Sequence, residues 1–204
     1  MRTQRRPVHR KLGLLKLDGS SEPVVIDGIE AFSFDPSGAF IVMRRYAPER
    51  QQGGGSQQGN QPPAAAQAQA DAPAPTGVTI LVRELETGRD TTFGNVAEYA
   101  WQNVRDPRKL KGRLLAFTVS TEDKTGNGIH LYDTATRVHR VLDSSASVYT
   151  GLAWREDADD LVVLRSQTDD TREGSTHAVL AWTGVSSASP VLQTLDPLKA
   201  VPAV

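Results

Sequence analysis

The chain has 204 residues, a formal net charge of −1 and no cysteine. This length fits one domain or two small ones, and the missing cysteines exclude disulfides, thiolate nucleophiles and cysteine-bound metals. The near-neutral charge excludes a global attraction to nucleic acid or anionic membranes, and no apolar stretch approaches the roughly 18 residues that span a bilayer.

The first ten residues form a basic segment that we expect to be frayed and solvated. The apolar run that follows, between Leu12 and Leu17, is interrupted by Gly13 and Lys16. A secretory signal needs about 7–15 consecutive apolar residues, so none is predicted. No aromatic residue is interleaved here to stack on bases, so a nucleic-acid arm is not predicted either.

Short β-type runs fill most of the remaining chain. Val, Ile, Leu, Thr and aromatic residues form the runs, and Gly, Asp, Asn, Ser and Pro separate them. In chain order the runs are EPVVID, AFIVMRRY, VTILVREL, RLLAFTVS, GIHLYDT, HRVLD, DLVVLRS and HAVLAW. No segment shows a sustained apolar period of 3.6 residues, so the chain is predicted to be all-β.

Residues 49–77 form a low-complexity insertion of Gln, Gly, Pro and Ala without a bulky apolar residue. Such a segment cannot bury enough surface to offset its conformational entropy, so it is predicted to be disordered. The strand pattern resumes after it. We therefore interpret it as an insertion within one structural unit, which is tolerated because the entropy of loop closure grows slowly with length.

Three segments, beginning at Ile29, Val96 and Tyr149, align as an internal repeat. Each has two large side chains at alternate positions, then a polar turn, then a nearly continuous apolar run typical of a strand covered on both faces. The large pairs are Phe32 and Phe34, Tyr99 and Trp101, and Leu152 and Trp154. We expect these residues, with Trp182, to pack in the core between units.

A second hairpin follows each segment, so the repeat has four strands and roughly 40–47 residues, the length of a propeller blade. Residues 11–27 match the second hairpin alone. The prediction is a partial β-propeller of about three and a half four-stranded antiparallel blades and about fourteen strands, cut from a longer chain. A β-sandwich is the alternative, although a sandwich has no reason to repeat a four-strand unit.

The expected boundaries follow from the repeat. They are a basic terminus at 1–10, a half blade at 11–27, blades at 28–95, 96–145 and 146–196, and a tail at 197–204.

Four phrases carry a resemblance to a known family: FSFDPSGAFIVMRR, GNVAEYAW, STEDKTGNGIHLYDTATRVHRVLD and YTGLAWREDADDLVVLRS. They resemble the N-terminal propeller of the prolyl oligopeptidase family of serine peptidases, especially its large bacterial members, and the related TolB-type propellers. The resemblance covers about residues 10–200 outside the insertion. It implies a propeller that admits short peptides to a Ser-Asp-His centre in a C-terminal α/β-hydrolase domain, and an exported, periplasmic protein.

That hydrolase domain is expected to be absent from this chain, so the chain is predicted not to be an enzyme on its own. The expected partners are the missing α/β-hydrolase domain or the remaining blades, and peptides, with no nucleic acid. A stand-alone TolB-like scaffold that binds a protein or ligand is the alternative.

Individual residues give no catalytic, cofactor-binding or metal-binding assignment. Ser186 lies in Gly-Val-Ser-Ser-Ala, which has Ala where a hydrolase elbow has its second Gly and is followed by Pro190. The histidines, His9, His130, His139 and His177, lack the tight spacing of zinc ligands. His130 and His139 fall on the two strands of one hairpin, where they could be neighbours.

Two acidic clusters and one glycine-rich turn are predicted to be solvated turns. The clusters are Asp157, Asp159 and Asp160, and Asp169 and Asp170. Neither has the alternating ligands, central Gly and final Glu of a calcium loop. The turn between Asp123 and Gly128 contains Asn-Gly but lacks the Gly-Lys-Ser/Thr ending of a phosphate-binding loop.

Overall fold

The computed structural model describes residues 8–48, 77–168 and 175–196, and its regular structure is antiparallel β-sheet, as the sequence predicted. No helix in these ranges is long and apolar enough to cross a membrane. The strands are β1 (Lys11–Leu14), β2 (Val24–Asp27), β3 (Ile29–Phe34), β4 (Phe40–Arg45), β5 (Val78–Glu84), β6 (Asp90–Trp101), β7 (Leu114–Val119), β8 (Gly128–Asp133), β9 (Val138–Ser144), β10 (Tyr149–Trp154), β11 (Leu161–Thr168), β12 (Ser175–Thr183) and β13 (Val191–Leu195).

Each strand pairs only with its neighbours in sequence. The result is a hairpin β1–β2, a seven-stranded sheet β3–β9 and a four-stranded sheet β10–β13. Strand β6 has 12 residues; its first half pairs with β5 and its second half with β7. Asn95 between the halves has a φ of 56°, and the register shifts nearby mark bulges. Bulges bend a strand, so β6 turns from one neighbour to the next.

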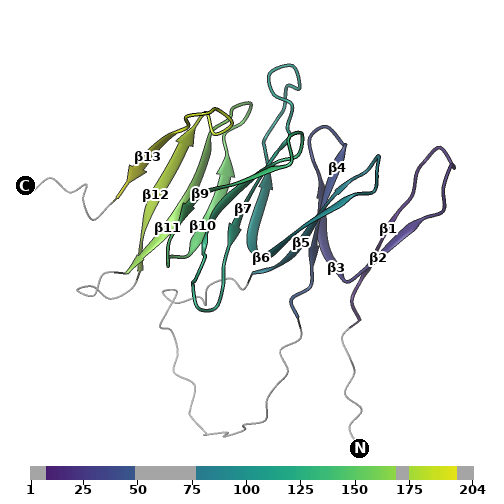
Figure 1. Ribbon diagram of the computed structural model, residues 1–204, viewed down its shortest axis with the longest axis horizontal. Helices are drawn as coiled ribbons and strands as arrows, with labels where there is room; N and C mark the ends of the chain where they lie inside the picture. Colours follow the sequence, from purple (N-terminus) through teal and green to yellow (C-terminus); the bar gives the residue numbers. More distant parts are fainter. Residues whose placement is uncertain (1–7, 49–76, 169–174, 197–204) are drawn as a thin grey trace, which may run out of the picture.

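We divide the seven-stranded sheet at this bend. Unit 1 is β3, β4, β5 and the first half of β6; unit 2 is the second half of β6 with β7, β8 and β9; unit 3 is β10–β13. Figure 1 shows the purple hairpin β1–β2 and then units 1, 2 and 3 side by side in chain order, ending at the yellow β13. The expectation of about fourteen separate strands is wrong in one detail, because one continuous strand closes unit 1 and opens unit 2.

The core consists of apolar layers between neighbouring units. One layer joins the hairpin to unit 1, a second joins units 1 and 2, and a third joins units 2 and 3. The apolar runs predicted from the repeat supply their centres: Ile41, Val42 and Met43 are fully buried, as are Leu115 and Ala116. These residues alternate between the two faces of their strands, so each unit is covered on both sides.

Polar contacts also join units 2 and 3. The carboxylate of Glu98 on β6 accepts the backbone N–H groups of Gly151 at 3.2 Å and Leu152 at 3.0 Å. The hydroxyl of Tyr149 donates to Asp143 at 2.7 Å, and burial raises the pKa of Tyr149 to about 12. These contacts fix β10 against β6 and β9.

The prediction that the paired large residues are core is correct only in part. Trp154 and Trp182 are 9% and 3% exposed, whereas Phe32 and Phe34 are each 51% exposed. The hairpin β1–β2 packs on residues of β3, β4 and β5, and the side chains of this first pair are not part of that layer. Residues 49–76 of the predicted insertion, Asp169 and Asp170, and the chain ends lie outside the described residues.

Candidate functional site

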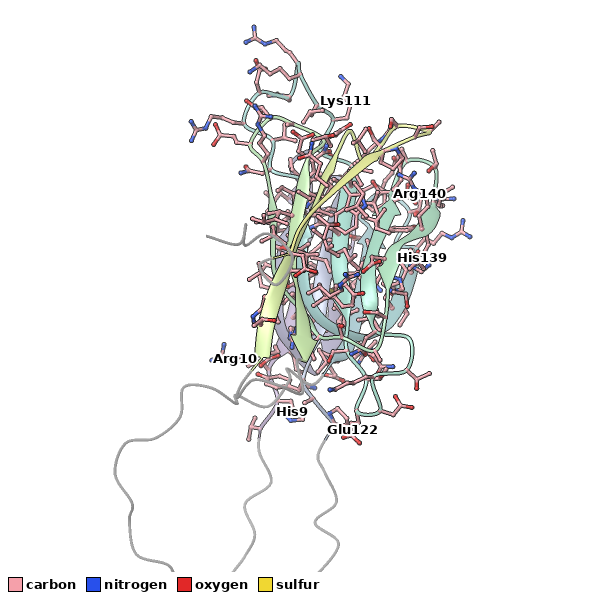
Figure 2. The ribbon with its side chains drawn as sticks, turned by 90° about the vertical axis from the view of Figure 1, so that its left-hand side faces the viewer. His9, Arg10, Lys111, Glu122, His139 and Arg140 are labelled. Atoms are coloured by element: carbon pink, nitrogen blue, oxygen red, sulfur yellow. The ribbon has the colours of Figure 1, made fainter. Side chains whose placement is uncertain are left out.

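The loop between β6 and β7, residues 102–113, is rich in Arg and Lys and stands at one end of the strands. Figure 2 labels Lys111 there and shows Arg10 and Glu122 at the opposite end. The corresponding connections of units 1 and 3, between β3 and β4 and between β10 and β11, are short turns. The loop residues between Arg105 and Arg113 therefore form a surface that units 1 and 3 do not have.

Neighbouring turns hold this loop on both sides. A Cβ atom at Gly112 would lie 2.6 Å from Cβ of Pro36 in the turn of unit 1. In the turn of unit 3, the carboxylate of Asp157 accepts the backbone N–H groups of Arg105 at 2.7 Å and Asp106 at 2.9 Å. These amides, that of Asp106 foremost, hold the pKa of Asp157 below its usual range.

A cavity of about 200 Å³ lies between the loop and unit 3. In its lining, the carboxylate of Asp159 accepts hydrogen bonds from the Gln102 amide and the Ser186 hydroxyl. The lining residues are Gln102, Lys109, Leu110, Lys111, Arg113, Leu114, Asp159 and Ser186. Polar groups from three separate connections therefore meet here, which makes this cavity the candidate site.

Ser186 does not have the surroundings of a catalytic serine. Its hydroxyl donates directly to Asp159, whereas a serine triad places an imidazole between hydroxyl and carboxylate. Two backbone amides beside it are already engaged: the N–H of Gly184 donates to the Asp160 carboxylate at 3.1 Å and that of Val185 to the Asp159 carbonyl at 2.8 Å. They cannot serve as oxyanion donors in this arrangement.

Most cations around the cavity are paired. Lys109 lies 3.6 Å from the Asp157 carboxylate, and Arg113 lies 3.3 Å from that of Asp133. Lys111 has no ion-pair partner within 4.0 Å in the described ranges. A second cavity, of about 420 Å³, shares Lys111 and Arg113 and extends towards unit 1. Among the described residues, Lys111 is therefore a cation without an ion-pair partner, and it lines both cavities.

His130 on β8 and His139 on β9 are neighbours, as the hairpin predicted. Nδ1 of His130 lies 2.8 Å from Nε2 of His139, the ring planes differ by 10°, and the centroids are 5.0 Å apart. With the nitrogens this close and the centroids this far apart, the rings meet edge to edge. One N–H therefore donates to the lone pair of the other ring. The two nitrogens face each other and do not converge on a metal ion.

The pair is held in its neutral form. Burial, and then the charge of His139, lowers the pKa of His130 to about 4, and burial lowers the pKa of His139. The stacked ring of Phe117, with its centroid 5.3 Å from that of His130, supplies part of the apolar surroundings. Protonation of both rings would place two like charges side by side and remove the N–H···N hydrogen bond.

The histidine pair predicts a loss of stability in mild acid. Histidine in an unfolded chain has a pKa near ~6.5, so the unfolded state binds protons before His130 does. Stability should be constant above about pH 7 and fall between about pH 6.5 and pH 4. The fall should reach about 1 kcal/mol at pH 5, after allowance for solvent screening of a partly exposed pair. Urea unfolding at neutral pH and at about pH 5 measures it.

The control variant is His130→Gln, which keeps a side-chain N–H donor but does not titrate. It should lose most of the difference between the two pH values. An unchanged difference would assign the acid sensitivity to carboxyl groups elsewhere and contradict the prediction.

The other residues considered in the sequence analysis make ordinary packing and turn contacts. The ring of His9 stacks on Tyr46 with centroids 4.4 Å apart, and His177 lies on β12 opposite Ser166. In the glycine-rich turn, the buried amide of Asn127 accepts the backbone N–H of Thr121 at 2.7 Å. The described residues contain no group of three or more His, Asp or Glu side chains that could hold a metal.

Two features of this end were not predicted from the sequence. Gln102 reaches Asp159 across 57 positions of sequence, and Pro36 supports Gly112. No local pattern marks either contact. The repeat alignment does contain one signal for this site: the first loop of the second repeat, which lines the cavity, is longer than the first loops of the other two.

No protein-family model and no curated protein sequence matches this chain. Among solved structures, the chain is similar to the β-propeller domain of the Trilobed protease from Pyrococcus furiosus, which has an open velcro topology. The identity is 13% and the TM-score 0.50, over 90% of this chain and 48% of that one. The acylaminoacyl peptidase of Pyrococcus horikoshii is 10% identical, with a TM-score of 0.39, over 76% of this chain and 23% of that one.

The first of these similarities assigns the fold. The antiparallel units match a β-propeller domain, so the predicted propeller architecture is confirmed at that level. The chain spans about half the length of the Trilobed protease structure.

Proposed function

We propose that this chain is a non-catalytic propeller segment that controls access of peptides to the α/β-hydrolase domain of a prolyl oligopeptidase-type serine peptidase. One observation carries the proposal: 90% of the chain matches the propeller domain of a protease. The resemblance of its strand and turn phrases to the prolyl oligopeptidase family supports the same assignment.

In this proposal units 1, 2 and 3 are blades and the hairpin β1–β2 is the outer half of another. The chain then contributes about three and a half blades, at residues 11–27, 28–95, 96–145 and 146–196. Side-by-side four-stranded meanders with apolar layers between them support this count, because that is how propeller blades pack.

A propeller of this kind would act by excluding large substrates and by positioning short peptides. The first strand of each blade, namely β3, the second half of β6, and β10, would line the central passage. Glu98 fixes the spacing of two of these strands through its hydrogen bonds to Gly151 and Leu152. Hydrolysis itself needs an activated nucleophile, a base and an oxyanion hole, and these would come from the hydrolase domain.

A stand-alone scaffold of TolB type is the second candidate. It is favoured by the two cavities at the loop end, which are both lined by Lys111. The coding sequence beyond codon 204 separates the two proposals. An in-frame α/β-hydrolase with a Gly-x-Ser-x-Gly elbow supports the peptidase, and a closing blade followed by a stop codon supports the scaffold.

The purified chain should hydrolyse neither a proline-containing chromogenic peptide nor a simple ester above background. The reason is that Ser186, the nearest approach to a nucleophile, has no imidazole beside it and flanking amides that are already bonded. The matched variant Ser186→Ala should behave identically. Turnover that disappears in Ser186→Ala would overturn the non-catalytic assignment.

A further inference from the structure

Equivalent aromatic residues join each unit to the one before it. The indole N–H of Trp101 on the first strand of unit 2 donates to the carbonyl of Ser33 on the first strand of unit 1, at 3.4 Å. The indole N–H of Trp154 in unit 3 donates to Ala100 in unit 2, at 3.0 Å. Ser33 and Ala100 occupy the same position of the repeat, so first strands pack on one another in a fixed register.

The first strand of unit 1 has no such neighbour within the described residues. Phe34 is equivalent to Trp101 and Trp154, and Phe32 to Tyr99, yet both phenylalanines are half exposed. Tyr99 and Trp101 pack into the layer between units 1 and 2. Phe32 and Phe34 should likewise pack on a preceding unit, but the hairpin β1–β2 supplies only its outer two strands.

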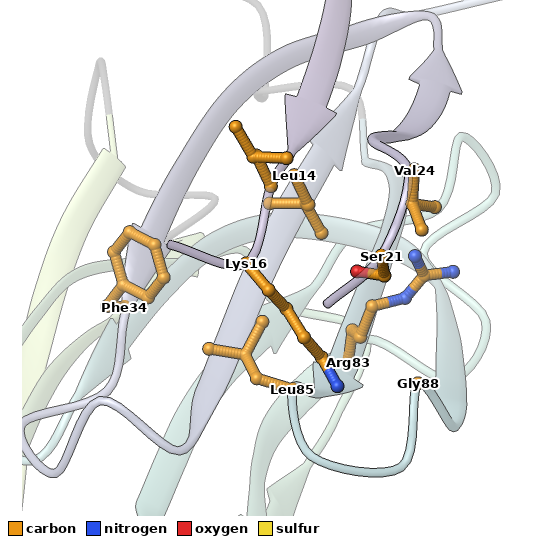
Figure 3. A pocket seen from close by; sticks show the side chains of 9 residues that line it. Leu14, Lys16, Ser21, Val24, Phe34, Arg83, Leu85 and Gly88 are labelled. Atoms are coloured by element: carbon orange, nitrogen blue, oxygen red, sulfur yellow. The ribbon is translucent and has the colours of Figure 1, made fainter. Parts of the chain in front are cut away.

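A groove adjoins the end of β3, where Phe34 lies. It has a volume of about 270 Å³ and lies between the hairpin and unit 1, as Figure 3 shows. Its apolar walls include Leu14 and Val24 from the hairpin and Phe34 and Leu85 from unit 1. The guanidinium of Arg83 in the lining is already bound to both oxygens of Asp90, at 2.7 Å each. Lys16 also lines the groove, so its walls are largely apolar and carry two cationic side chains, Lys16 and the ion-paired Arg83.

The edge of β1 beside this groove is unpaired in the described residues. In units 2 and 3 the third strands, β8 and β12, pair on both sides, whereas β1, their equivalent, pairs with β2 alone. The carbonyl of Arg10 accepts the N–H of Gly28 at 3.1 Å. Hydrogen bonding alternates along an antiparallel ladder, so Lys11 and Gly13 direct their backbone groups to the free edge.

We propose that this groove and the edge of β1 bind a β-hairpin with the inner-strand pattern of the repeat itself: two bulky residues at alternate positions, a polar turn and an apolar run. Its second strand pairs with β1, and its first strand packs on Phe32 and Phe34. Units 2 and 3 show this arrangement within the same chain, because β7 lies on β8 and β11 on β12. Strand addition of this kind uses backbone hydrogen bonds for affinity and side-chain pockets for specificity.

The occupant is a hairpin not already engaged in a blade. A second intact copy of the chain does not offer one, because its own inner strands β11 and β7 are paired on both sides. A small apolar ligand would fill the groove but leave the N–H and C=O groups of β1 unpaired. The proposal concerns this edge alone and does not depend on the peptidase assignment.

A synthetic peptide of residues 149–166, the inner hairpin of unit 3, serves as the probe with the full 204-residue chain. Saturable binding in a 1:1 complex is expected. Amide exchange at Lys11 and Gly13 should slow by about tenfold or more, with little change at the already bonded Leu12 and Leu14. A control peptide with Leu152→Ser and Trp154→Ser should bind at least about tenfold more weakly.

The matched host variants are Gly13→Pro and Gly13→Ala. Proline removes the N–H that the guest strand needs, whereas a Cβ at Gly13 meets no atom within 4 Å. Gly13→Pro should weaken binding by about tenfold or more, and Gly13→Ala should bind like the unaltered chain. Equal binding by both variants, or no binding at all, overturns the proposal. A dimer of the unaltered chain that Gly13→Pro abolishes also overturns it, since the occupant is then a second copy.

Discussion

Trp154→Ala is expected to lower the free energy of unfolding by about 3–5 kcal/mol. Trp154 is 9% exposed and belongs to the apolar layer between units 2 and 3. Its indole N–H also donates to the Ala100 carbonyl at 3.0 Å. The substitution leaves a cavity and removes the donor to a carbonyl at the junction, and both effects act on the same layer.

Urea unfolding of the chain measures the change, and two controls separate the causes. Trp154→Phe keeps an aromatic ring but loses the N–H, so its smaller loss, about 1–2 kcal/mol, reports the hydrogen bond and the reduced volume. Ser186→Ala, an exposed position, should change stability by less than about 0.5 kcal/mol. If Trp154→Ala folded with unchanged stability but lost binding to a ligand, Trp154 would belong to a surface site and not to the core.

The sequence predicts the strands and their repeat well, because both depend on local pattern. Alternating large residues followed by an apolar run mark β3–β4, the second half of β6 with β7, and β10–β11. The equivalence of Phe34, Trp101 and Trp154 also follows from the alignment alone. Their exposure does not, because burial depends on whether another unit lies alongside. Phe34 therefore occupies a position that the repeat pattern marks as core, but its side chain is half exposed in this chain.

Local sequence also does not predict that β6 is one continuous strand. Gly94 and Asn95 look like a turn between two strands, and Asn95 does have the positive φ of 56° that asparagine tolerates. The chain nevertheless bends there without leaving the sheet, because the register shifts on β5 and β6 take up the change of direction. Whether such a bend ends a strand is decided by the neighbours that pair with it.

The candidate site and the histidine pair show the same division between local and long-range information. The neighbouring positions of His130 and His139 follow from one short hairpin, and the structure confirms them. The meeting of Gln102, Asp159 and Ser186 does not, because these residues come from three connections that only the packing of units brings together. Chemistry carried within one hairpin is therefore more predictable here than chemistry assembled between units.

The second large loss of stability is expected for Gly77→Ala, because Gly77 packs against the bend of β6. A Cβ at Gly77 would lie 2.6 Å from the Cα of Asn95 and closer still to its carbonyl group. The obstacle is backbone at the bend where unit 1 passes into unit 2, so a side-chain rotation cannot relieve it. We expect a loss of roughly 3 kcal/mol, at the upper end of overpacking substitutions.

Gly94→Ala is the matched control, because it lies beside the same bend, where an added Cβ meets no atom within 4 Å. Alanine there should be neutral or slightly stabilising, since it reduces the freedom of the unfolded chain. Urea midpoints of the two variants and the unaltered chain, measured together, test both expectations. Equal midpoints for Gly77→Ala and Gly94→Ala would contradict the prediction. They would show that the strand after Gly77 can move away from Asn95. The bend would then not be the rigid joint between units 1 and 2 that the register shifts indicate.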